Sequence, residues 1–334
     1  MPTSNRPPWT YFGYIPNRPL WAVACAIFTL STVAHTWQAI KSRRWIFSLW
    51  VICGILEIAG TGARVAAQSY PKVQTFTLFI TQEVAMIIAP TFLNALLNGL
   101  FAMLARSISP ELALFGRPKL LAGFLMVADV GGLFLQGAGG GISGSAVSNY
   151  SNLKTGQDVT LAGIIFQLIF LTAFCAVHAH FLYLAITITK NKADTSPRAC
   201  GIRERTLALK ETLWVITTMI VLLYIRQIYR VIQLSNGWES KFALVEWPLV
   251  VFDTLFVAVV MVMGSIWHYD RIFLQVVKAW RTTHPTDGAA SSASESPSVP
   301  KGPELNAGTA DAKSPRSPDN PEMSYHTAAT KSAV

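Results

Sequence analysis

Seven long apolar segments constrain the fold of this chain more than any other feature. They lie at about residues 20–40, 45–67, 76–105, 120–142, 159–189, 210–234 and 247–268. Each is long enough for the roughly 20 residues that a helix needs to cross the hydrocarbon core of a bilayer. Only 13% of all residues are charged, about half the usual share in a soluble domain. We therefore expect an all-α membrane protein whose residues 20–268 form a seven-transmembrane helix bundle.

The distribution of positive charge predicts the direction of the bundle. The connections after the first, third and fifth segments, with the start of the tail, hold Lys41, Arg43, Arg44, Arg106, Arg117, Lys119, Lys190, Lys192, Arg198, Arg203, Arg205, Lys210, Arg271, Lys278 and Arg281. The opposite side holds only Arg6, Arg18, Lys72, Lys154 and Lys241. Because cytoplasmic loops carry the excess of Lys and Arg, we expect an extracellular N-terminal segment, 1–19, and a cytoplasmic tail, 269–334.

One independent feature agrees with this topology. The sequon "NYS" at Asn149 falls on the predicted outer side, which makes Asn149 a candidate glycosylation site. The tail from about residue 282 is rich in Ser, Pro, Ala and Gly, a composition that favours disorder. The net charge of +9 is thus explained by topology, and we expect no nucleic-acid partner.

Most of the apolar segments carry one polar stripe. On a helix, residues three, four or seven apart share a face, and this spacing groups Glu57 with Arg64, Asp129 with Gln136, and Arg226 with Arg230. Ionisable residues at membrane depth are costly, so they face the bundle interior and find partners there. The stripes predict a polar, hydrated interior, although each residue taken singly could merely lock the bundle together.

Depth along the predicted helices divides these residues into two sets. Near the outer side we expect a charge network or gate formed by Arg64, Glu83, Arg226, Arg230, Glu246 and Asp253. In particular, Arg226 is expected to pair with Asp253 or Glu83. Nearer the middle we expect a substrate path formed by Glu57, Asp129, Gln136 and Gln167.

Small residues and one proline are expected to shape the helices. The run "GAGGGISGS" lacks the Lys-Ser/Thr of a phosphate-binding loop, and Gly137 and Gly141 form a small-xxx-small pair. We assign both to helix packing or helix termination, and assign Gly60 and Gly62 to packing as well. Pro90 should kink the third segment.

Histidines leave a metal or haem site open as an alternative. His178 and His180 point to different sides of one helix, so they do not easily share a metal. His35, His178 and His268 could still converge from three helices. No lysine lies in the seventh segment, which removes the attachment point of a retinal Schiff base.

Several motifs together resemble one known family. They are "YFGYIP", "LEIAGTGAR", "IAPTF", "DVGGLFLQGAGGG", "IRQIYRVIQ" and "EWPLVVFDTL". In this order they are similar to the fungal lipid-translocating exporter family, seven-span proteins that include aminocholesterol-resistance and sphingoid long-chain-base export proteins. The resemblance covers about residues 11–268. One departure is Gln233-Leu234, where family members often have Glu-Tyr.

The resemblance implies the function of the chain and its location. It implies a fungal multi-pass protein, usually of the plasma membrane, that translocates amphipathic lipids and confers resistance to toxic ones. The family's motif residues map to Glu57, Gly60, Gly62, Arg64, Gln82, Pro90, Asp129, Gln136, Arg226, Arg230, Glu246 and Asp253. We expect no enzymatic activity, cofactor or metal, and membrane lipids or amphipathic small molecules as partners.

Two alternatives to a transporter remain at this point. One is a non-transporting seven-span sensor of lipid or membrane stress that signals through the basic 190–210 segment. The other is an intramembrane metal-dependent hydrolase or a haem-binding protein.

Overall fold

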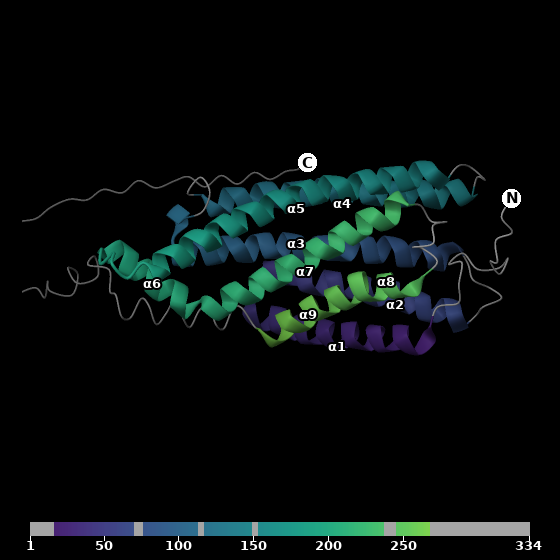
Figure 1. The fold of residues 1–334 in the computed structure, drawn as a ribbon. Coiled ribbons are helices and arrows are strands. Elements are labelled where there is room, and N and C mark those ends of the chain that lie inside the picture. The colour runs from purple at the N-terminus through teal and green to yellow at the C-terminus, as the bar shows by residue number, and fades with distance from the viewer. Residues whose placement is uncertain (1–16, 70–75, 113–116, 149–152, 237–244, 268–334) are drawn as a thin grey trace, which may run out of the picture. The chain divides into compact units, whose positions relative to one another are not determined.

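The computed structural model describes residues 17–69, 76–112, 117–148, 153–236 and 245–267. Seven spans among them are long and apolar enough to cross a membrane, which confirms the predicted class (Figure 1). The first six are α1 (Arg18–Ser42), α2 (Ser48–Ser69), α3 (Phe76–Ile108), α4 (Pro118–Ser148), α5 (Leu153–Lys190) and α7 (Lys210–Ser235). The seventh joins α8 (Glu246–Leu249), the π-helical turn η4 (Val250–Leu255) and α9 (Phe256–Ile266). Asn149, His268, most of the N-terminal segment and the tail lie outside the described residues.

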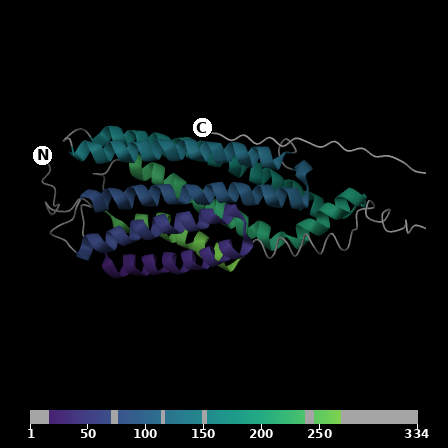
Figure 2. The same ribbon diagram turned by 180° about the vertical axis from the view of Figure 1, so that it is seen from behind.

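Helix α3 lies at the centre of the bundle. In its apolar 18-residue stretch, 72% of the residues are buried, whereas in the corresponding stretches of the other six spans the share is between 28% and 44%. Figure 2 shows α3 between the α1–α2 pair and the α4–α5 pair. Phe101 of α3 packs edge-on against Phe174 and Phe181 of α5. A polar side chain on α3 is therefore surrounded by protein, and its partners must come from neighbouring helices.

Glycines allow α4 and α5 to approach closely, but they are not the glycines that the sequence suggested. A Cβ at Gly139 would lie 2.5 Å from the Thr160 nitrogen and 2.7 Å from the Gly156 oxygen. In contrast, a Cβ at Gly137 or Gly141 would meet nothing within 4 Å. The packing role assigned to Gly137 and Gly141 is therefore wrong, because both face outward. The helix also continues to Ser148, so neither residue ends it.

This difference gives a direct test of the α4–α5 contact. We expect Gly139→Ala to lower the melting temperature of the purified protein, because the added methyl group meets backbone atoms that cannot move without separating the helices. Gly137→Ala is the matched control, and it should melt no lower than the parent, since alanine favours a helix over glycine. Equal melting temperatures for the two variants would contradict this contact.

The segment between the fifth and sixth spans contains a helix that the sequence analysis missed. The sequence predicts only a basic connection at residues 190–210, but α6 (Pro197–Ala208) lies within them. Ser196 caps this helix by accepting a hydrogen bond from the Ala199 nitrogen at 3.3 Å, and Pro197 occupies its first turn. Serine followed by proline is a recognisable helix start, so the sequence did contain the signal.

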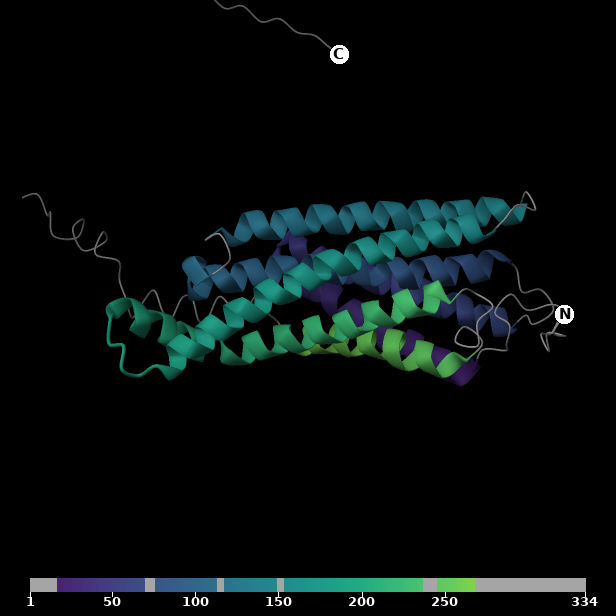
Figure 3. The same cartoon turned by 45° about the horizontal axis from the view of Figure 1, so that its top comes forward.

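Helix α6 is held to the end of α3. Arg205 donates a hydrogen bond to the Ile108 carbonyl at 3.2 Å, which satisfies an oxygen left free at the helix end. With 38 residues, α5 is about 57 Å long, well beyond the roughly 30 Å of a bilayer core. Figure 3 shows α5, α6 and α7 extending past the ends of α1 and α9.

Candidate functional site

Two buried arginines of α7 share one carboxylate. Arg226 donates from Nε to Asp253 Oδ1 at 2.6 Å, and Arg230 donates from Nε to the same oxygen at 2.9 Å. Arg230 also donates from Nη2 to the second oxygen of Asp253. Arg226 and Arg230 are one helical turn apart, so both guanidinium groups reach the same point on the last span. The pairing predicted for Arg226 is thus found with Asp253.

Asp253 lies in the π-helical turn η4. A π-turn adds one residue to a helical turn, and such turns frequently occur at functional sites. Asp253 is only 1% exposed. A carboxylate at this depth requires compensation by opposite charge and hydrogen bonds, and the two guanidinium groups supply both.

Arg226 also binds a carbonyl that Pro90 leaves free. Pro90 has no N–H, so the carbonyl of Met86, four residues earlier in α3, lacks its helical partner. Arg226 donates from Nη2 to this oxygen at 2.6 Å. Helix α3 continues through Pro90. The sequence predicted only that Pro90 kinks this helix, but Pro90 also leaves the Met86 carbonyl available as an acceptor for the buried Arg226.

Glu83 is a less tightly held member of the same charge cluster. It accepts from Arg230 Nη1 at 3.4 Å and from Gln82 Nε2 at 2.9 Å. An ionised carboxylate has about four acceptor positions, and these two bonds use two of them. Glu83 also borders a pocket between α3, α4 and α5.

A second ion pair lies where α1 begins and α2 ends. Arg64 of α2 lies 3.9 Å from Glu246 of α8, and its guanidinium stacks on the Trp21 ring at 4.4 Å from the ring centre. Trp21 donates to the same Glu246 carboxylate from Nε1. The six residues predicted as one network therefore form two separate groups of ion pairs. One group consists of Arg226, Arg230, Glu83 and Asp253, and the other of Arg64 and Glu246.

Glu57 lies close to the first group. It is 1% exposed, and it interacts electrostatically with Asp253, Arg226 and Arg230. Its Oε2 has no hydrogen-bond partner among the described residues. Glu57, Glu83 and Asp253 are thus three acidic side chains near two guanidinium groups.

Gln167 of α5 connects four helices. Its Nε2 donates to Thr91 of α3 at 3.1 Å and to the Asp129 carbonyl of α4 at 3.3 Å. Its Oε1 accepts from Gln136 of α4 at 2.8 Å and from Gln227 of α7 at 3.4 Å. Glycine at position 132 makes room for it, since a Cβ there would lie 2.3 Å from the Gln167 side chain.

A chain of polar contacts therefore joins the arginine cluster to Asp129. Arg226 donates to Gln227, Gln227 contacts Gln167, and Gln167 reaches the backbone of Asp129. The Asp129 carboxylate accepts from Asn98 of α3 at 2.9 Å, and no ion pair is found for it among the described residues. Three of the four residues predicted as a substrate path belong to this series of polar contacts: Asp129, Gln136 and Gln167.

Three contributors to this site were missed in the sequence. Gln227 was not singled out, although it precedes Arg230 by three residues and so shares its face. Trp21 and the Met86 carbonyl carried no sequence signal as arginine partners.

The two glycines of α2 differ in their surroundings. Gly60 packs against Met86, because a Cβ at position 60 would lie 2.6 Å from the Met86 side chain. Gly62 does not pack: a Cβ there would meet nothing within 4 Å, and it lines a wide groove between α1 and α2.

The histidines have separate environments. His35 Nε2 lies 2.9 Å from the Met261 carbonyl, and its ring stacks on Trp50. His178 Nε2 lies 2.9 Å from the Thr217 hydroxyl. Across the part of the chain that the structure describes, no three His, Cys, Asp or Glu residues are placed to hold a metal ion.

Comparison with known proteins gives a family match over most of the bundle. Residues 50–275 match the model of a family described as "RTA1 like protein". The sphingoid long-chain base transporter RSB1 of Saccharomyces cerevisiae is 26% identical over 284 residues, which covers 77% of this chain and 73% of the relative.

A second relative from the same yeast carries a different name. Protoporphyrin uptake protein 1 of Saccharomyces cerevisiae is 26% identical over 228 residues, 68% of this chain and 70% of that protein. No solved structure matches the chain. The resemblance seen in the sequence motifs is thus confirmed at the level of a family that includes fungal lipid transporters.

Proposed function

Because this chain belongs to the RTA1-like family, we propose that it translocates amphipathic lipids with a positively charged head across the membrane in which it is embedded. The name of the yeast relative, a sphingoid long-chain base transporter, supports this substrate class. The proposal includes export across the plasma membrane and resistance to toxic amphiphiles. It involves no catalysis.

The observation that carries the proposal is the polar chain inside an apolar bundle. Moving a charged head through hydrocarbon costs several kcal/mol or more. Carboxylates and amides along the route lower that cost, because they replace the solvation that water provided. The interior contains such groups from Arg226 and Arg230 to Asp129. No ion pair is found among the described residues for the carboxyl groups of Glu57 and Asp129, so they are available to a cation.

We assign two roles along this route. Glu57, Asp129, Gln136 and Gln167 form the path that receives the head in transit. The ion pairs act as a gate, with Arg226, Arg230, Asp253 and Glu83 at one point and Arg64 and Glu246 at the other. Under the orientation predicted from the loops, this gate faces the outer leaflet.

Reconstitution tests the proposal. Purified full-length protein in liposomes should increase the rate at which a fluorescent long-chain amine crosses the bilayer, compared with protein-free liposomes of the same composition. A fluorescent diacylglycerol, which has the tails but no charge, should cross at the same rate in both. If folded protein leaves the amine's rate unchanged, the chain is not a transporter of this class, and the sensor alternative is favoured.

A further inference from the structure

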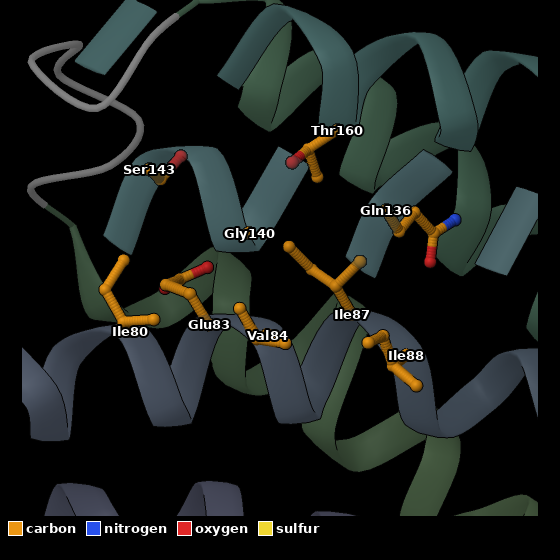
Figure 4. Close-up of a pocket in the computed structure, with 9 residues that line it drawn as sticks. All are labelled: Ile80, Glu83, Val84, Ile87, Ile88, Gln136, Gly140, Ser143 and Thr160. Carbon is orange, nitrogen blue, oxygen red and sulfur yellow. The ribbon is translucent and has the colours of Figure 1, made fainter. Parts of the chain in front are cut away.

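The pocket between α3, α4 and α5 has a lining that is chemically one-sided. It is bordered by Ile80, Glu83, Val84, Ile87, Ile88, Gln136, Gly140, Ser143 and Thr160, and its cavity volume is about 20 Å³. None of these residues is basic. The polar groups are a carboxylate, two hydroxyls and a carboxamide, and they are set in an apolar wall of isoleucine and valine (Figure 4).

Most of the hydrogen-bonding capacity left in this pocket belongs to acceptor oxygens. Gln136 is 2% exposed, and its Nε2 is used by Gln167 while its Oε1 has no partner. The Thr160 hydroxyl gives its proton to the Gly156 carbonyl, so its lone pairs remain available. Glu83 has acceptor positions left after Arg230 and Gln82. These acceptors favour a ligand that donates hydrogen bonds, and the Glu83 carboxylate, which the ligand would share with Arg230 at 3.4 Å, favours a positively charged one.

The size and shape of the pocket restrict the ligand further. A cavity of about 20 Å³ has room for a group the size of one water molecule, so it suits a single ammonium group and not a whole lipid. Figure 4 shows the Glu83 carboxylate directed from α3 toward Gly140. Any side chain at position 140 would crowd this opening, since a Cβ there would lie 2.8 Å from Val84.

We propose that this pocket binds the primary ammonium group of a long-chain amine, with Glu83 as the opposite charge and Ser143 and Thr160 as neutral acceptors. The unpartnered oxygen of Gln136 is the next acceptor along the route. Asp129, Gln136 and Ser143 are spaced by seven residues and so lie on one face of α4, about 10 Å apart. This inference rests on the proposed function and specifies the head group that it recognises.

Binding measurements on the purified full chain in nanodiscs test the site. The probes are hexadecylamine, hexadecyltrimethylammonium and hexadecanol, which share one tail. The primary amine has three N–H donors and should bind about tenfold tighter than either of the others, because one hydrogen bond to a charged group is worth about that factor. Equal affinity for the amine and the trimethyl analogue would overturn the proposal, as would displacement of the amine by sodium ions.

Variants locate the binding within the molecule. Ser143→Ala should weaken amine binding several-fold and leave binding of the trimethyl analogue unchanged. Ser145→Ala is the matched control, because Ser145 is on the same helix but exposed, and it should bind like the parent. Unchanged amine affinity in Ser143→Ala would count against the site.

The two proposals can fail separately. If liposomes show translocation of long-chain amines but binding shows no preference for the primary ammonium, the pocket assignment is wrong and the transport function stands. If the amine binds with the stated pattern but nothing crosses the bilayer, the pocket is a ligand site and the transport proposal is wrong.

Discussion

Replacing Asp253 with alanine is expected to remove most of the folded protein from the membrane. Arg226 and Arg230 are 2% and 0% exposed, and both depend on this carboxylate. Removing one partner of a buried ion pair typically costs about 3–5 kcal/mol, because the other charge is left uncompensated. Here one substitution affects two arginines. The loss is a large share of the roughly 5–15 kcal/mol that stabilises a folded domain.

Membrane yield and the melting temperature of the solubilised protein measure this effect. Glu111→Ala is the matched control, because Glu111 also pairs with an arginine, Arg198, but at 62% and 71% exposure of the two side chains. Exposed pairs contribute about 0–1 kcal/mol, so this variant should melt close to the parent.

A double variant isolates the ion pair itself. Arg226→Ala together with Asp253→Ala should recover part of the yield lost in Asp253→Ala, since one stranded charge is gone. Arg226→Ala alone should be milder than Asp253→Ala, because Arg230 still compensates the carboxylate. If Asp253→Ala melted like Glu111→Ala, the shared carboxylate would not stabilise the bundle.

Neutralising the carboxylates of the proposed path should abolish function without unfolding the protein. Asp129→Asn keeps the shape of the side chain, and its partner Asn98 can still donate to the remaining oxygen. Glu57→Gln replaces a carboxyl group whose Oε2 has no hydrogen bond to lose among the described residues. We expect cells that express either variant to lose protection against toxic cationic amphiphiles, because an amide cannot become the carboxylate that pairs with the head.

Growth in such a compound, with the surface level of each variant measured alongside, tests this expectation. Asp158→Asn serves as the control, because Asp158 is an exposed carboxylate of α5 and its neutralisation should leave protection intact. If Asp129→Asn and Glu57→Gln reach the surface normally and protect as well as the parent, the head group does not pass these residues.

The sequence by itself determined the class of the protein and its polar interior. The length of an apolar segment and the 3.6-residue period are local properties, so seven spans and their polar faces could be identified without tertiary structure. The motifs also identified the family. The spacing of Arg226 and Arg230 indicated that both lie on one face of their helix.

Only the tertiary structure decided which partners meet. Asp253 rather than Glu83 became the main partner of Arg226, and the carbonyl released by Pro90 became its second acceptor. Gly139 packs against α5 while Gly137 and Gly141 face outward. Gln167 became the centre of an amide network that includes the overlooked Gln227.

The physical reason is the same in each case. Helical period fixes the direction of a side chain around its own helix, but the rotation and depth of each neighbouring helix are set by packing of the whole bundle. A residue such as Gly137 can therefore fit a packing motif and still face outward, because its helix is turned to place Gly132 and Gly139 against α5.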